Sequence, residues 1–197
     1  MGAKYSNISA QANYSYGLNN FSFGIVYQTD GVDTSEYFYE LQNYYSAIFT
    51  TNFVGLGLPA DVWESVIALI DIVSHNTAVC SNTPDGVCYL SESCDNYVAF
   101  SDYTFRVNFT DSEGGNYIRV PLATFAQTIG GKCYLDISYL EQGASQTDNI
   151  IFGGQFFQEF FGVFQNDHSV DPPTQRALLT PNNNAIYNAY VGTEILP

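Results

Sequence analysis

A strand, a polar turn and a helix follow one another between Ala47 and Ser74. The first part, AIFTTNFVGLGLP, starts as an apolar run, is interrupted by threonines and an asparagine, and ends in Gly-Leu-Gly-Leu-Pro. Proline suits the first turn of a helix, and apolar residues then recur at helical spacing, which predicts a helix over residues 59–74. Such a turn commonly presents a reactive side chain, yet this one has no acid, histidine, cysteine or lysine.

The remainder of the chain favours β structure. With 16 Tyr and 15 Phe, the composition suits pleated, half-buried surfaces. In YTFRVNFT (103–110) aromatic and apolar residues alternate with polar ones, which predicts a strand with Asn108 on the outer side. Further strands are expected at 21–28, 117–122 and 133–140, with a turn or hairpin loop at 29–36, a short helix at about 155–161 and a last strand near the end. We therefore predict one mainly β barrel or sandwich lobe with one main helix.

The charge excludes two classes of partner. A formal net charge of −15, with only five Lys plus Arg, cannot neutralise nucleic-acid phosphates and disfavours docking on anionic lipid. No apolar run is long enough to span a bilayer, since the best candidate, VIALIDIV, is broken by Asp71. We expect no nucleic-acid partner and no membrane span.

The cysteines predict disulfides in place of a metal site. There are four, with no C-x-x-C spacing, and neither His75 nor His168 lies at ligand spacing from them. Two disulfides, no metal and no cofactor are the expectation.

N-x-S/T sequons also indicate a secretory route. The candidate glycosylation sites are Asn7, Asn13, Asn20 and Asn108. The first residues show no apolar leader, so we expect a mature or trimmed form of a secreted or lumenal protein. Gly2 and Ser6 match a myristoylation pattern, but that cytosolic modification conflicts with paired cysteines and clustered sequons.

The order of these elements resembles the C-terminal lobe of pepsin-like aspartic proteases. The similar features are the strand SFGIVYQ, the strand-loop-helix AIFTTNFVGLGLPADVWESV, the hairpin FRVNFTDSEGGNYIRVPL flanked by cysteines, and the block NIIFGGQFFQEFFGVF. They cover roughly Phe21 to Phe164. The resemblance implies a lobe over residues 21–166, preceded by a sequon-rich segment at 1–20 and followed by a Pro- and Asn-rich extension at 167–197.

The resemblance also implies what each position does. Thr50, Thr51 and Asn52 fall on the Asp-Thr-Gly of the catalytic loop, and Ile151-Phe152-Gly153 falls on the hydrophobic-hydrophobic-Gly block that supports it. It pairs Cys94 with Cys133 across the hairpin and leaves Cys80 to pair with Cys88.

The catalytic loop departs from the family pattern. Such enzymes use two carboxylates that share a proton, and a threonine hydroxyl at position 50 cannot replace one of them. We also expect no second lobe, since the segment before Phe21 is too short to hold one. Asp102, Asp136 and Asp148 have no Asp-Thr-Gly context, so they are interpreted as surface or turn residues. We therefore expect no enzyme activity.

The expected function is that of a pseudoprotease acting as a secreted structural, binding or assembly module. The face around Thr50 and Gly153 would pack on the other lobe of an enzyme, so we expect another chain, a second copy or the chain's own tail to cover it. One alternative is half of a two-chain aspartic endopeptidase. Another is an unrelated secreted β-sandwich of the lectin-like or coat-protein kind.

Overall fold

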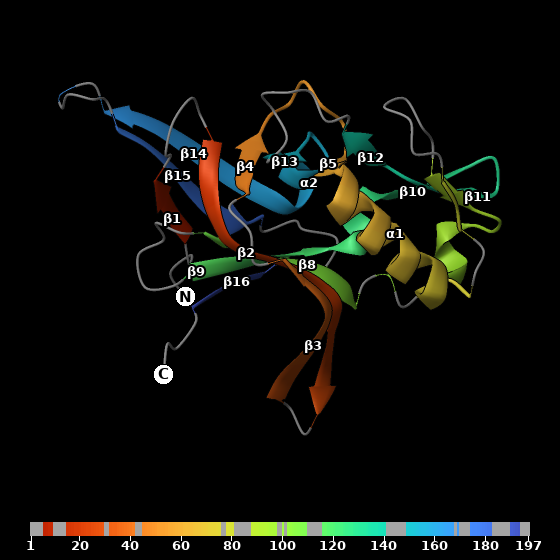
Figure 1. Ribbon diagram of the computed structural model, residues 1–197. Helices are drawn as coiled ribbons and strands as arrows, with labels where there is room; N and C mark the ends of the chain where they lie inside the picture. The colour runs from red at the N-terminus through yellow and green to blue at the C-terminus, as the bar shows by residue number, and fades with distance from the viewer. Residues whose placement is uncertain are drawn as a thin grey trace.

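The computed structural model of the chain is mainly β, with one main helix and one short helix, as the sequence predicts (Figure 1). The structure describes residues 6–9, 15–29, 32–41, 45–75, 78–80, 88–97, 100, 102–109, 116–140, 149–167, 169, 174–182 and 190–193.

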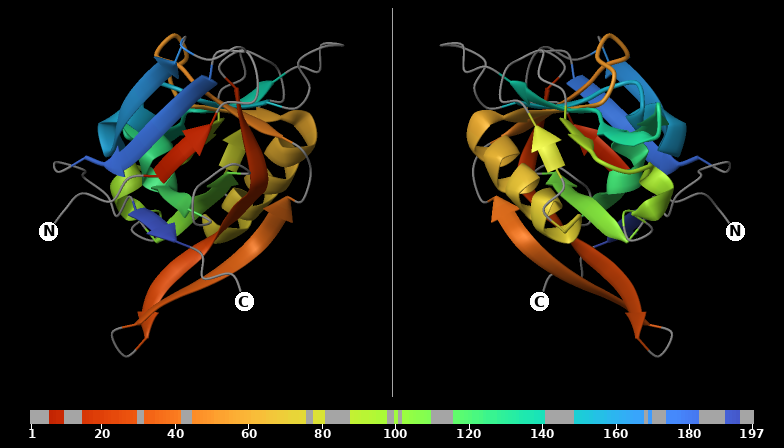
Figure 2. Two further views of the ribbon diagram at one scale, coloured as in Figure 1. Left: turned by 90° about the vertical axis from the view of Figure 1, so that its left-hand side faces the viewer. Right: turned by 90° about the vertical axis from the view of Figure 1, so that its right-hand side faces the viewer.

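The largest sheet curls around the core in the order β12-β5-β13-β4-β2-β8-β9-β16, with β3 also paired to β2. Its strands are β2 (Ser15–Thr29), β3 (Val32–Leu41), β4 (Ser46–Phe49), β5 (Leu56–Pro59), β8 (Tyr103–Phe109), β9 (Asn116–Pro121), β12 (Ile137–Leu140), β13 (Asn149–Phe152) and β16 (Tyr190–Thr193). Two pairings, β12 with β5 and β13 with β4, are parallel. The β2–β3 hairpin extends away from the body of the lobe (Figure 2).

Two smaller sheets complete the lobe. One runs β10-β11-β7-β6, from strands β6 (Ala78–Cys80), β7 (Cys88–Leu90), β10 (Ala126–Ile129) and β11 (Lys132–Leu135). The other runs β1-β15-β14, from strands β1 (Ser6–Ser9), β14 (Phe160–Asp167) and β15 (Thr174–Pro181). Disulfides join Cys80 to Cys88 and Cys94 to Cys133, which are the pairs that the resemblance implies.

Helix α1 (Ala60–Val73) follows β5 directly and buries Val62, Trp63, Val66 and Ile70. Its Trp63 donates from Nε1 to the carbonyl of Ile137 at 3.3 Å, which ties the helix to β12. Helix α2 (Phe156–Glu159) is a single turn between β13 and β14. Single-turn 3₁₀ helices lie at Cys94–Asn96 and Leu122–Phe125.

Phenylalanines fill the core in two groups. On β2 and β8, Phe21 stacks on Phe105 and Phe23 packs on it at a tilt, with ring centroids 5.7 and 4.9 Å apart. Behind the loop that follows β4, Phe152 and Phe156 pack on Phe49, with ring centroids 5.4 and 5.2 Å from it. Phenylalanines therefore supply a large part of the buried side chains that the structure describes.

The structure changes three details of the prediction. Asn108 is only 6% exposed, so its predicted outward position is wrong: β8 lies between β2 and β9, within the sheet, and its polar face is covered as well. Residues 32–36 belong to β3, where a loop is predicted. The strand expected over 133–140 is divided at Asp136 into β11 and β12, which belong to different sheets.

The proposed segment boundaries fall inside strands. β2 begins at Ser15 and β14 ends at Asp167, so each strand crosses one of the expected limits. β1 pairs with β15, and β16 pairs with β9. Both terminal segments thus contribute strands to the sheets of the lobe.

Candidate functional site

The loop between β4 and β5 is held by the backbone that follows β13. β13 lies between the two strands, parallel to β4 and antiparallel to β5. Thr50 donates its amide to the carbonyl of Phe152 at 3.0 Å and so continues the β4–β13 ladder by one residue. Next, Gly153 donates to the carbonyl of Gly55 at 2.7 Å, and Gly154 to that of Phe53 at 2.7 Å. The ends of the loop are therefore fixed by main-chain hydrogen bonds to the backbone around the end of β13.

Two glycines allow this close approach. A Cβ on Gly153 would lie 2.5 Å from the carbonyl oxygen of Phe53 and 2.6 Å from that of Gly55. A Cβ on Gly55 would lie 1.8 Å from the carbonyl oxygen of Asp136. Real side chains do not approach backbone so closely, so only glycine fits at these positions.

The tip of the loop presents hydroxyl and amide groups. Thr50 is half-buried, and its Oγ1 accepts the amide of Asn52 at 3.2 Å, which closes a small turn. Thr51 and Asn52 are exposed. A hydroxyl engaged in this way is an acceptor for a backbone donor, and no carboxylate stands at the tip to act as acid or base.

Asp136 holds the back of the same loop. Its carbonyl accepts the amide of Leu56 at 2.8 Å, and its Oδ2 accepts the side-chain amides of Gln127, at 2.7 Å, and of Gln155. Burial raises the pKa of the Asp136 carboxyl, while the hydrogen bonds from Gln155 and Gln127 act in the opposite direction.

The sequence interpretation of Asp136 as a surface or turn residue missed these contacts. Its partners come from separate elements, Gln127 from β10 and Gln155 from the turn before α2. No local sequence signal joins three such positions. Asp102 is exposed, as expected, and Asp148 lies outside the described residues.

Apolar side chains surround the loop. Phe49, one residue before Thr50, contacts the rings of Phe152, Phe156 and Phe164 at centroid distances of 5.4, 5.2 and 6.1 Å. Val54 is 64% exposed, although it is a large aliphatic residue. The loop region therefore combines a buried aromatic base with an apolar residue facing solvent.

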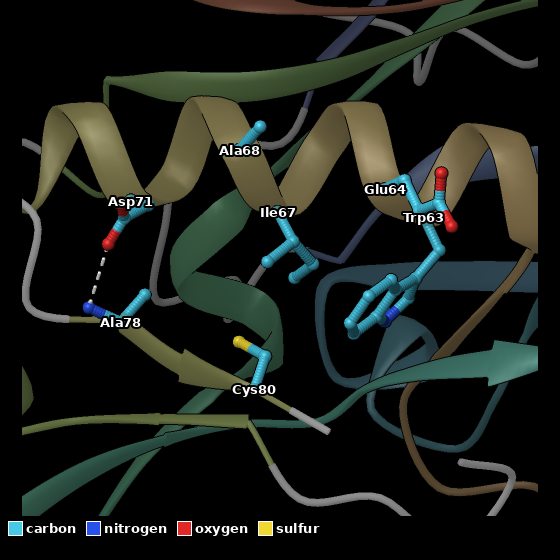
Figure 3. A pocket seen from close by; sticks show the side chains of 7 residues that line it. All are labelled: Trp63, Glu64, Ile67, Ala68, Asp71, Ala78 and Cys80. Carbon is cyan, nitrogen blue, oxygen red and sulfur yellow. Dashed lines mark hydrogen bonds between the residues drawn. The ribbon is translucent and has the colours of Figure 1, made fainter. Parts of the chain in front are cut away.

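A separate hollow of about 420 Å³ lies between α1 and β6 (Figure 3). Its lining residues are Trp63, Glu64, Ile67, Ala68, Asp71, Ala78 and Cys80. Asp71 already accepts the amide of Ala78 at 3.1 Å from its Oδ1, which bridges the helix and the strand. None of Thr50, Thr51, Asn52 or Gly153 lines this hollow, so it is distinct from the loop.

The remaining predictions concern metals, membranes and sequons. Among the described residues, no group of three or more His, Cys, Asp or Glu side chains is placed to hold a metal ion. Within the same part of the chain, no helix has the length and apolar character needed to cross a membrane. Asn7 lies in β1 and Asn20 in β2, whereas Asn13 and His168 lie outside the described residues.

Comparisons of the chain with models of protein families and with curated proteins found no match.

Proposed function

We propose that this protein is a non-catalytic lobe of the pepsin-like aspartic-protease type that works as a secreted structural or binding module. The single observation that carries the proposal is the loop of Thr50, Thr51 and Asn52. Its backbone is held by β13 and by paired glycines, yet its tip offers only hydroxyl and amide groups. A rigid loop without an acid suits contact with another molecule better than proton transfer.

The surface around the loop supports an assembly role. Val54 exposes 64% of its surface. The residues on either side of it, Phe53 and Gly55, accept hydrogen bonds from the amides of Gly154 and Gly153. Exposed apolar residues next to a rigid loop favour burial against a protein partner. The partner in this proposal is another protein chain or a second copy, and it covers the face around Thr50 and Gly153.

Secretion is part of the same proposal. Two disulfides pin the described part of the lobe, and oxidising compartments are where such bonds form and persist. The net charge of −15 keeps such a protein soluble outside the cell.

Hydroxyl-radical footprinting tests the proposed face. The protein in its native extracellular fluid is compared with the purified chain at high dilution. The proposal predicts that Val54 is protected in the fluid, while Ile72 on α1, which is 63% exposed, labels equally in both samples. Equal labelling of Val54 in both samples would contradict a covered face.

A further inference from the structure

Strand β14 forms an open edge of the three-stranded sheet. All eight of its residues pair with β15 on one side, and in the described part of the chain no strand pairs with its other side. Figure 2 shows β14, β15 and β1 side by side at the surface of the lobe. The unpaired N–H and C=O groups of such an edge are a template for one more strand.

The edge lacks the usual protection against pairing. Proteins commonly guard an exposed edge with charges, a proline, a bulge or a very short strand. Of the eight residues of β14 only the last, Asp167, is charged and none is proline, and the strand pairs with β15 without a shift of register. Phe161 is 57% exposed and Phe164 is 46% exposed. The chain as a whole has a net charge of −15, so a strand with a single charge and two exposed phenylalanines is unusual on its surface. Such a strand favours contact with another strand.

The sequence of the edge indicates which strand would fit. Around Gly162 the residues are similar in both directions, with phenylalanine two positions away on each side and Phe161 and Val163 next to the glycine. If a two-fold axis passes through Gly162, Phe161 lies opposite Val163 of the second copy. Phe160 also falls opposite Phe164 of the second copy, but its ring is buried against Phe156 of its own lobe, with ring centroids 4.7 Å apart. The pair of Phe161 with Val163 therefore carries the argument: aromatic–β-branched pairs stabilise antiparallel strands, and the axis forms this pair twice.

We propose that two copies of this chain associate by antiparallel pairing of residues 160–164 of their β14 strands. The two three-stranded sheets would then join into one continuous sheet across the two-fold axis. This inference rests on the proposed assembly function and names its partner as a second copy. Within one lobe β14 lies near the loop, since the ring of Phe164 lies 6.1 Å from that of Phe49, which precedes Thr50.

Charge makes the association depend on salt. Each copy has a net charge of −15, so the two lobes repel one another while the paired strands attract. Screening shortens this repulsion to about 8 Å at physiological ionic strength. We therefore expect a weak dimer that becomes tighter as salt is added, the opposite of what ion pairing across the interface would give.

Sedimentation velocity over a concentration series tests the pairing. The wild-type chain is expected to move from its monomer mass of 21.8 kDa toward twice that mass. Phe161→Lys places a charge opposite Val163 of the second copy and should raise the dimer dissociation constant by about tenfold or more. Ile129→Lys is the matched control, because Ile129 is 51% exposed but lies in β10, in another sheet. It should leave the dissociation constant unchanged.

A cysteine pair tests the register. In the double variant Phe161→Cys/Val163→Cys, each new thiol lies opposite a thiol of the second copy, with Cβ atoms about 4.5–5.5 Å apart. Mild oxidation should give a covalent dimer. Val163→Cys alone should not, because that position faces Phe161 of the second copy. Equal cross-linking of the single and double variants would overturn the register.

The outcomes separate this inference from the proposed function. A wild-type chain that stays monomeric at every concentration, or a dimer that Phe161→Lys leaves intact, overturns the strand pairing. If Val54 is still protected in the native fluid in that case, the proposed function stands with a different partner. A dimer that is lost in Phe161→Lys, with Val54 unprotected in both footprinting samples, supports the strand pairing and removes the face around Thr50 from the proposed function.

Discussion

The amide of Gly153 donates a 2.7 Å hydrogen bond to the carbonyl of Gly55, and this contact ties the far end of the loop that begins at Thr50 to the backbone after β13. It links the end of β13 to the start of β5, two strands far apart in the sequence. This backbone contact and its neighbours hold the loop, and the hydroxyl of Thr50 adds one hydrogen bond at the tip.

Replacing Gly153 with alanine should destabilise the fold. The added Cβ would lie 2.5 Å from the carbonyl oxygen of Phe53, so the loop must move. We expect a loss of about 1–3 kcal/mol in the free energy of unfolding, measured by urea denaturation. Gly154→Ala is the matched control, because its Cβ would come no closer than 3.7 Å to its neighbours. Similar losses in the two variants would contradict the close approach at Gly153.

Replacing Thr50 with valine removes the acceptor for the amide of Asn52 while keeping the shape of the side chain. Because the net value of such a hydrogen bond is modest, we expect a loss of about 0.5–1.5 kcal/mol in unfolding free energy. Thr50→Ser keeps the oxygen and should lose less. A larger loss in the serine variant than in the valine variant would show that the hydroxyl does not stabilise the turn.

Asp136 gives a predictable pH dependence. Its pKa is raised in the folded state, mainly by burial, so the folded protein binds this proton more tightly than the unfolded chain does. The resulting stabilisation is fully present below the unfolded pKa of about 3.9 and is lost as the pH rises through the folded pKa. Asparagine at position 136 does not titrate, so the Asp136→Asn variant lacks this pH-dependent stabilisation. Measured by urea denaturation, wild type should therefore gain stability relative to the variant as the pH falls from about 7 to about 4.

The opposite trend with pH would contradict the raised pKa of Asp136. Asp102→Asn is the matched control for the substitution itself, since it makes the same change at an exposed residue just before β8.

Asn108 should carry no glycan in the folded protein. Its side chain is 6% exposed, and in the β2–β8 register it lies opposite Asn20, a second sequon. A glycan on Asn108 would have to displace the groups that cover this face of the sheet, and glycans on both residues would compete for the same space. Glycopeptide mass spectrometry of folded, secreted protein checks this. A natively folded form with a glycan on Asn108 would contradict the burial of this side chain.

Local sequence patterns predict where helices and strands lie better than they predict which distant segments those elements contact. The helix after Pro59 and the β8–β9 hairpin follow from spacing, because apolar periodicity and turn residues act within a few positions. The contacts of Asp136 with Gln127 and Gln155, and the burial of Asn108, depend on strands brought together from distant segments. Alternation along one strand does not reveal how its outer face is covered, which is why Asn108 was placed wrongly.

The sheet at the chain ends was missed for the same reason. β1 and β15 pair across most of the sequence, from Ser6 with Leu179 to Ser9 with Arg176. Nothing within either short segment indicates that partner. The open edge of β14, and with it the proposed dimer, becomes visible only once this sheet is known.

Cleavage of a peptide library at acidic pH tests the central claim most directly, that the loop beginning at Thr50 has no catalytic role. The wild-type protein and Thr50→Val are compared, each with and without pepstatin. The account predicts no pepstatin-sensitive cleavage by either protein, because no carboxylate stands at the tip of the loop. Pepstatin-sensitive cleavage by wild type that is lost in Thr50→Val would contradict it.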